Sequence, residues 1–383
     1  MPDAATPDKV QLRVSLYPWV PEADSLASWI EQDFETQHPE IDLVVRTMER
    51  SYDWLPGYVS DLAYEIDQTV AALTQEGDDS QDLIEVDTMI LGALIERNAV
   101  APFALSEPSF LPSAQEAVSQ DGETWGVPHW TCGYFVISED AGVREANDLT
   151  ALLDRLADAG TERADIVGDI DGSWDAVMVY LDAFIDSYGD GDVQAALAAE
   201  TLDPMVDSAL RALGTSCAQD GEAMCGSDGV EKFATGGADA LIGYSERLHP
   251  ILATEGRTVA NLHIASAPLG SGSHPMLFTD ALVLSPRCSS ERCQEAARAF
   301  ASYYVSDRVF EVVLMGLDTD TSVARYLLPS TTTAFDTDAV AADPYYRQLE
   351  EEIQGARAYP TSGVPEARER GAIQAQVKTA LGL

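Results

Sequence analysis

A strand–helix–strand pattern at the start of the chain constrains the fold class more than any other feature of the sequence. Apolar residues alternate over residues 10–16, recur at helical spacing over 24–37 and alternate again over 41–46. A helix between two strands is the connection that neighbouring parallel strands require, because a tight turn cannot join them. The opening of the chain therefore predicts an α/β fold built on a parallel sheet.

Later segments continue this pattern and place polar side chains at the ends of strands. Further strands are predicted at residues 83–87, 238–246 and 276–284, and helices at 59–73, 89–96, 147–159, 174–188, 200–213 and 293–305. Ligands of open parallel sheets gather beyond the carboxyl ends of the strands. Tyr17 and Trp19 follow the first strand and Asp87 ends the third, so we expect these side chains at one edge of the sheet.

The length of the chain predicts two lobes. With 383 residues and 46% hydrophobic composition, the chain can bury a sizeable core but exceeds one ordinary domain. The order of its elements resembles the two-lobed periplasmic solute-binding proteins, in which the chain crosses between lobes repeatedly. We predict a first lobe of residues 9–128 and 275–325 and a second of 129–274 and 326–383, with the first crossing near residues 128–132.

The charge of the chain excludes several classes of partner. Acidic residues outnumber basic ones 65 to 22, for a net charge of −43. Such a surface repels phosphate backbones and anionic membranes, so we expect no nucleic-acid partner. No apolar run approaches the roughly 18 residues of a membrane span. We interpret the acidity as adaptation to a salty medium, where salt screens self-repulsion.

Four of the five cysteines form two close pairs, Cys217 with Cys225 and Cys288 with Cys293. Neither pair has the spacing of common zinc ligands and no histidine accompanies them, so we predict disulfides and no metal site. Disulfides indicate export, and we expect a secreted or periplasmic protein. The first residues do not resemble a signal peptide, so the export signal is expected to have been removed upstream.

Cys132 is the cysteine without a partner in sequence. It lies between a Pro/aromatic turn and the apolar run of residues 134–137. Such a thiol is either a small buried hydrophobe or a reactive group, and it becomes a nucleophile only when a base or positive dipole helps to form the thiolate. Glu246 is a candidate base. His129 is close in sequence to Cys132, but it could equally cap or pack the turn.

Two acidic residues share the pattern aromatic-x-acid at predicted strand ends. Glu246 follows Tyr244 by two residues, and Asp280 follows Phe278 by two. A carboxylate at such a position is expensive to bury without a partner. Each also has a structural interpretation, since Glu246 could pair with Arg247 and Asp280 could hold a loop.

Five segments together resemble thiaminase type I, also called thiamine pyridinylase. They follow one another along almost the whole chain as residues 16–21, 85–88, 126–133, 242–247 and 278–282. The resemblance implies a type II periplasmic-binding-protein-like fold with two lobes, a central ligand cleft and multiple chain crossings. It also implies an enzyme that replaces the thiazole of thiamine with another nucleophile through a covalent cysteine adduct, without metal or cofactor.

The resemblance assigns roles to individual residues. Cys132 would attack the pyrimidine carbon next to the ring nitrogen, and Glu246 would take its proton and later help to expel the thiazole. Asp280 would hydrogen-bond the aminopyrimidine. Further substrate contacts would come from Tyr17, Trp19, Tyr52, Asp87 and Tyr244. Aromatic faces and carboxylates attract the thiazolium cation of thiamine, and an acidic cleft selects cationic or neutral acceptors such as a pyridine, an amine or a thiol.

Two other functions fit the same fold class. A non-catalytic receptor for thiamine or its pyrimidine fragment, feeding a transporter, would share the fold and an acidic aromatic cleft, but it would not need a thiol beside a carboxylate. A sugar receptor predicts stacking tryptophans and neutral polar groups in place of Cys132. For the transferase we expect a monomer that binds a small molecule.

Overall fold

A computed structural model gives the fold of the chain in two compact units. It describes residues 9–17, 19–47, 65–77, 79–158, 163–170, 175–189, 193–199, 201–219, 222–226, 229–320, 323–359 and 367–383. Unit 1 is made of residues 1–131, 278–322 and 329–337, and unit 2 of residues 132–277, 323–328 and 338–383. The chain therefore passes from one unit to the other more than once, first at Thr131–Cys132.

The sheet of unit 1 begins with the predicted strand–helix–strand opening. Its strand order is β14–β6–β13–β3–β1–β2. The strands are β1 (Val10–Leu16), β2 (Ile41–Thr47), β3 (Leu83–Asp87), β6 (Val127–Cys132), β13 (Met276–Leu284) and β14 (Leu328–Pro329). β1 runs parallel to β2 and β3, and β13 runs antiparallel to β3. Helix α1 (Ala23–Gln37) connects β1 to β2, which confirms the predicted parallel connection.

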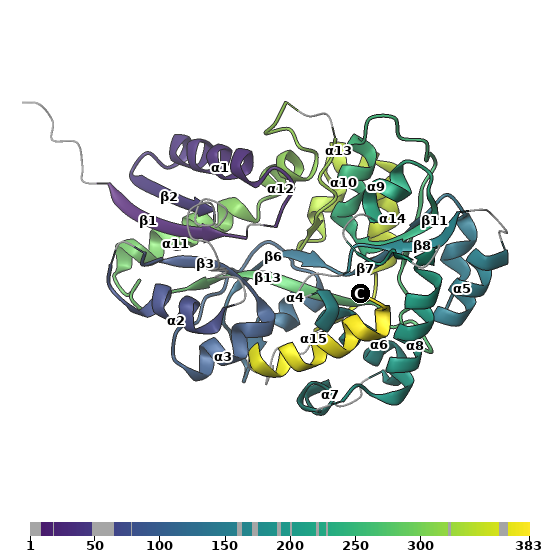
Figure 1. Cartoon of the computed structure of the whole chain (residues 1–383). Coiled ribbons are helices and arrows are strands. Elements are labelled where there is room, and N and C mark those ends of the chain that lie inside the picture. The colour runs from purple at the N-terminus through teal and green to yellow at the C-terminus, as the bar shows by residue number, and fades with distance from the viewer. Residues whose placement is uncertain are drawn as a thin grey trace, which may run out of the picture. The chain divides into compact units, whose positions relative to one another are not determined.

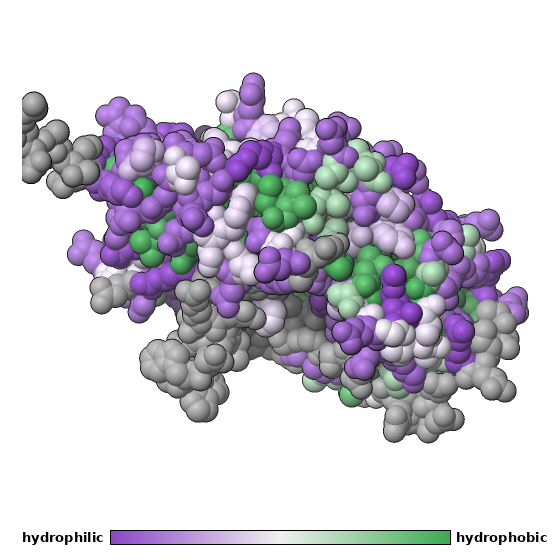
Figure 2. All heavy atoms as spheres, turned by 90° about the horizontal axis from the view of Figure 1, so that it is seen from above, coloured by the Kyte–Doolittle hydropathy of each residue, from purple (hydrophilic) through white to green (hydrophobic). Residues whose placement is uncertain are grey.

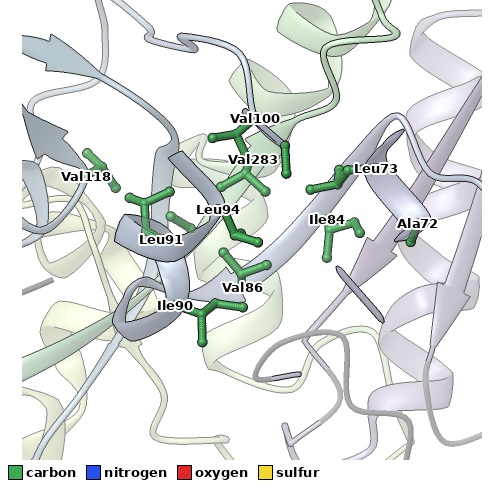
Figure 3. Close-up of a cluster of buried hydrophobic side chains, with 12 residues drawn as sticks. Ala72, Leu73, Ile84, Val86, Ile90, Leu91, Leu94, Val100, Val118 and Val283 are labelled. Atoms are coloured by element: carbon green, nitrogen blue, oxygen red, sulfur yellow. The ribbon is translucent and has the colours of Figure 1, made fainter. Parts of the chain in front are cut away.

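Helices cover both faces of this sheet (Figure 1). Ile84 and Val86 of β3 pack against α2 (Ile66–Thr74) and α3 (Leu91–Glu96) in the apolar cluster of Figure 3. Each fully buried aliphatic side chain contributes about 1.5–3 kcal/mol. The remaining helices of unit 1 are α4 (Pro112–Ala117), α11 (Glu291–Tyr304) and α12 (Asp307–Leu314). Glu85, between the two apolar residues of β3, contacts Tyr304 of α11 on the opposite face.

The sheet of unit 2 has the order β12–β7–β11–β8. Its strands are β7 (Tyr134–Ser138), β8 (Ala164–Gly168), β11 (Ala238–Tyr244) and β12 (His263–Ser266). β11 runs antiparallel to β7 and parallel to β8. The helices of the unit are α5 (Leu149–Asp158), α6 (Asp175–Tyr188), α7 (Val193–Ala198), α8 (Pro204–Ser216), α9 (Gly229–Ala234), α10 (Leu248–Ala253), α13 (Asp338–Ala342), α14 (Pro344–Ile353) and α15 (Ala367–Leu381).

Short paired strands complete the architecture. β4 (Ser119–Gln120) pairs with β5 (Glu123–Thr124), β9 (Ala218–Gln219) pairs with β10 (Glu222–Ala223), and β15 (Arg357–Ala358) pairs with the start of β13.

Several predicted elements have different bounds in the structure. The helix expected at 200–213 begins at Pro204, because the side chain of Asp203 caps it by accepting from the backbone N–H of Met205. The strand expected at 238–246 ends at Tyr244, and a 3-10 turn follows over Ser245–Arg247. Of the helix expected at 59–73, residues 59–64 lie outside the described residues.

The cysteine pairing agrees with the sequence prediction. Cys217 is bonded to Cys225, Cys288 is bonded to Cys293, and Cys132 takes part in neither disulfide. Within the described residues, no helix combines the length and apolarity that crossing a membrane would need. Hydrophilic residues cover most of the coloured surface in Figure 2, and apolar residues appear there in small patches.

Two carboxyl groups are buried one turn apart on α6 in unit 2. Asp182 is 4% exposed and Asp186 2% exposed. Asp186 accepts a hydrogen bond from the backbone N–H of Leu269 at 2.7 Å. Burial raises the pKa of both carboxyls, to about 6 for Asp186, and the charge of Asp186 raises the pKa of Asp182 further.

The Asp182→Asn variant should gain stability over the wild type as the pH rises. An acid whose pKa is raised by folding stabilises the native state at low pH, and this contribution disappears as the pH rises from the unfolded pKa of 3.8 through the folded pKa. Asparagine imitates the protonated carboxyl at every pH. We expect the melting temperature of the variant to exceed that of the wild type by about 2–4 °C at pH 8 and by less at pH 4, measured by calorimetry.

The exposed Asp158 of α5 offers a matched control. Its change to asparagine alters the same charge without relieving burial, so its melting temperature should follow that of the wild type at both pH values. A constant difference between Asp182→Asn and the wild type from pH 4 to pH 8 would contradict the prediction.

Candidate active site

The predicted site residues fall into two groups, one in each unit. Unit 2 holds Cys132, Tyr244 and Glu246, and unit 1 holds Tyr17, Trp19, Asp87 and Asp280. Tyr52 lies outside the described residues.

In unit 2, a tyrosine follows the candidate nucleophile by two residues and pairs with a second tyrosine. Cys132 ends β6 and is half-buried, and Tyr134 begins β7 two residues later. Tyr134 is the direct partner of Tyr244 in the antiparallel pair of β7 and β11. Their hydroxyl oxygens are 2.9 Å apart, and their rings stack with centroids 4.7 Å apart. The two tyrosines therefore fix the register at the ends of both strands.

Cys132 and Glu246 both adjoin this strand pair along the chain. The β7–β11 pair ends at Tyr134 and Tyr244, Cys132 precedes Tyr134 by two residues, and Glu246 follows Tyr244 by two. Glu246 lies in the 3-10 turn after β11, not inside the strand as predicted, because the backbone turns at Ser245. Along the chain, the cysteine and the glutamate therefore flank the end of the β7–β11 pair that Tyr134 and Tyr244 form.

An arginine connects Glu246 to a second carboxylate. The guanidinium of Arg247 forms an ion pair with Asp169, and its Nη1 atom lies 3.6 Å from Oε1 of Glu246. The same guanidinium lies over the ring of Tyr244, 5.9 Å from its centroid. Arg247 is therefore shared between two carboxylates, and its contact with Asp169 is the closer one. The ion pair with Asp169 holds the turn that carries Glu246, and Glu246 is not the sole carboxylate partner of Arg247.

Two carboxylates are neighbours across the sheet of unit 1. Asp280 of β13 is paired with Asp87 of β3, and both side chains are almost completely buried. Asp87 accepts a hydrogen bond from the backbone N–H of Met89 at 2.8 Å and so caps the 3-10 helix Thr88–Ile90. The prediction that Asp280 ends a strand is wrong, because β13 continues to Leu284. Asp280 nevertheless lies where its neighbour β3 ends, at the edge that the topology predicted.

The two aromatic residues after β1 differ in exposure. Tyr17 is half-buried, and its backbone N–H donates to Oε2 of Glu85 at 2.8 Å. The Trp19 side chain is 55% exposed. A tryptophan in this state is not a core residue, which removes the structural alternative for Trp19.

Sequence reasoning missed Tyr134 and Glu85. Tyr134 follows Cys132 by two residues, which in an extended chain places both side chains on one face. Glu85 is a charged residue inside an apolar strand, a pattern that indicates a buried partner.

Comparison with known proteins places the chain near one enzyme group. No protein-family model matches the chain. Thiaminase-1 of Paenibacillus thiaminolyticus is 21% identical over 373 residues, covering 89% of this chain and 80% of that protein. The predicted resemblance to thiaminase type I is confirmed. The segments that carry the resemblance extend along almost the whole chain, as this coverage does.

Solved structures confirm the predicted fold class. Thiaminase I of Clostridium botulinum, in complex with thiamin, has a TM-score of 0.75 at 17% identity and covers 97% of this chain and 100% of its own. The GacH receptor of Streptomyces glaucescens, solved with and without acarbose, has a TM-score of 0.67 at 16% identity, with 97% and 99% covered. An enzyme and a receptor thus share this fold, so the fold alone does not separate the two functions.

Proposed function

We propose that this protein is a thiamine-degrading transferase of the thiaminase type I kind. The observation that carries the proposal is the thiol of Cys132, which is in neither disulfide and precedes by two residues the Tyr134–Tyr244 pair that Glu246 follows by two. The similarity to thiaminase-1 over 89% of the chain supports the same function. A receptor would not need a thiol beside a carboxylate.

The reaction can be written with these residues in named roles. The sulfur of Cys132 forms a bond to the pyrimidine carbon next to the ring nitrogen, and its proton passes to Glu246. The bond between the pyrimidine methylene carbon and the thiazolium nitrogen then breaks, and its electron pair stays with the nitrogen, which leaves as neutral thiazole. An acceptor such as a pyridine, an amine or a thiol adds to the methylene carbon, and the cysteine is expelled.

The remaining predicted contacts complete the proposal. Asp280 would hydrogen-bond the aminopyrimidine, and Tyr17, Trp19, Tyr52, Asp87 and Tyr244 would contact the substrate. The two disulfides support a secreted or periplasmic location. The protein would act as a monomer.

Mass spectrometry after incubation with thiamine and aniline tests this function. The transferase should release free thiazole and form one pyrimidinyl-aniline product per thiamine consumed, with repeated turnover. Incubation without protein is the control for the spontaneous reaction. Saturable thiamine binding without product would instead support the receptor for thiamine or its pyrimidine fragment.

A further inference from the structure

Glu85 is a buried carboxylate that connects four elements of unit 1. Its side chain in β3 is fully buried. Oε1 lies 2.6 Å from Nδ1 of His129 on β6. Oε2 accepts from the backbone N–H of Tyr17 after β1 at 2.8 Å and from the hydroxyl of Tyr304 on α11 at 3.3 Å. Burying an unpaired carboxylate is costly, and these three donors offset that cost.

His129 is held in one orientation as a neutral donor. Burial lowers the pKa of His129, although the adjacent Glu85 carboxylate acts in the opposite direction. A neutral imidazole that approaches a carboxylate through Nδ1 carries its proton there and donates it. The ring stacks on Tyr304 with centroids 3.6 Å apart and lies 5.2 Å from Phe310. The ring therefore cannot turn away from Glu85 without disturbing this packing.

Tyr304 is the third donor to Glu85 and belongs to the rigid part of the unit. Its side chain is buried and stacks on Phe300 of the same helix. Burial, together with the charge of Glu85, raises the pKa of Tyr304 well above its usual value. The hydroxyl thus keeps its proton and remains a donor to the carboxylate.

An apolar side chain would fill this position at lower cost if packing were its only role, because buried charges are often replaced by apolar groups without loss of stability. Glu85 supplies what an apolar residue cannot, which is an acceptor for the backbone N–H of Tyr17 directly after β1. Trp19 lies two residues further along the chain. On β3, Asp87 follows Glu85 by two residues and therefore lies on the same face.

We infer that Glu85 is a positioning residue for the substrate. Resting on the proposed function, the inference is that its carboxylate fixes the backbone at Tyr17, directly after β1 and two residues before Trp19. Glu85 itself touches no reacting atom. Its loss should weaken the contacts that Tyr17 and Trp19 make to thiamine in the ground state and the transition state alike, which raises KM and leaves kcat nearly unchanged.

The Glu85→Gln variant tests this role. Glutamine has the same shape and one acceptor oxygen, but it lacks the second acceptor and the charge that the three donors share. We expect KM for thiamine to rise about ten-fold, with kcat within about two-fold of the wild type. The same change in the Cys132→Ser background should raise the thiamine Kd, measured by calorimetry, by a similar factor. This second measurement does not depend on turnover.

Asp33 provides a matched control, because it accepts a hydrogen bond from the tyrosine that is next to Tyr304 on α11. Its carboxylate on α1 accepts from the hydroxyl of Tyr303 at 2.8 Å, and Tyr303 precedes Tyr304 on α11. Asp33→Asn should lower the melting temperature and leave KM and Kd unchanged. Should Glu85→Gln fail to fold, Tyr304→Phe against Tyr303→Phe repeats the comparison with one hydroxyl removed from each network, and only Tyr304→Phe should raise KM and Kd.

The outcomes separate this inference from the proposed function. The positioning role would be overturned if KM and Kd changed equally in the Glu85 and Asp33 variants. It would also be overturned if Glu85→Gln lowered the melting temperature but left KM and Kd unchanged. A wild-type protein that binds thiamine without forming product removes the transferase function, while the Kd values still decide the role of Glu85. A wild-type protein that does not bind thiamine overturns both.

Discussion

Replacing Cys132 with serine should abolish thiamine turnover, with kcat lower by about a thousand-fold or more, as for other enzymes that lose their nucleophile. A serine hydroxyl has the same shape but does not ionise near neutral pH, so no nucleophile comparable to a thiolate forms. Thiamine binding should persist, because the substitution removes no side-chain volume beyond the difference between sulfur and oxygen. Steady-state kinetics and calorimetric titration of the variant measure the two effects separately.

The disulfides of the chain make the control for this variant direct. Four of the five cysteines are bonded in pairs, so a thiol reagent should modify one group per wild-type chain and none in Cys132→Ser. An unchanged melting temperature would show that the loss of turnover is not a loss of folding. Turnover at the wild-type rate in Cys132→Ser would contradict nucleophilic catalysis by Cys132 and assign the reaction to another group.

Glu246→Gln should lower kcat by about 10²–10⁴-fold, the usual contribution of a positioned general base. Glutamine cannot accept the thiol proton, so the fraction of thiolate at Cys132 falls. The rate at which iodoacetamide alkylates Cys132 at neutral pH should therefore fall in the variant, and this rate is measured without substrate. The ion pair of Arg247 with Asp169 holds the turn in both proteins, so the variant should keep its local structure.

The exposed Glu255 lies in the same unit and gives the matched control. Glu255→Gln also removes one negative charge, but at a position farther along the chain from β11 than Glu246. Both kcat and the alkylation rate should therefore stay at wild-type values. An alkylation rate that Glu246→Gln leaves unchanged would assign the activation of Cys132 to another group.

Local patterns predicted the elements of the fold well. Alternation over residues 10–16 and the apolar run of residues 276–284 predicted β1 and β13 with the bounds that the structure has, because strands buried against helices need apolar residues. The end of β11 was predicted two residues late. The chain there turns into Ser245–Arg247 and the ion pair with Asp169, and no local pattern encodes that distant partner.

The site was predictable only in part for the same reason. Its candidate residues carry local signals, such as a cysteine outside the two close cysteine pairs or an acid after an aromatic residue. Their partners depend on topology, since Tyr134 and Tyr244 are 110 residues apart and Glu85 and Tyr304 are 219 apart. The sequence shows a charged residue in an apolar strand, but only the packed structure shows that His129 is its hydrogen-bond partner.

The indole of Trp19, more than half exposed after β1, has a consequence for binding in salt. A ligand that covers this ring removes apolar surface from water, and the free energy gained in this way strengthens on warming. Attraction between a cation and a chain of net charge −43 is weakened by dissolved ions, whereas water release is not screened. At high salt concentration, contact with the Trp19 ring would therefore still contribute to the binding of a flat cationic ligand, when long-range electrostatic attraction no longer does.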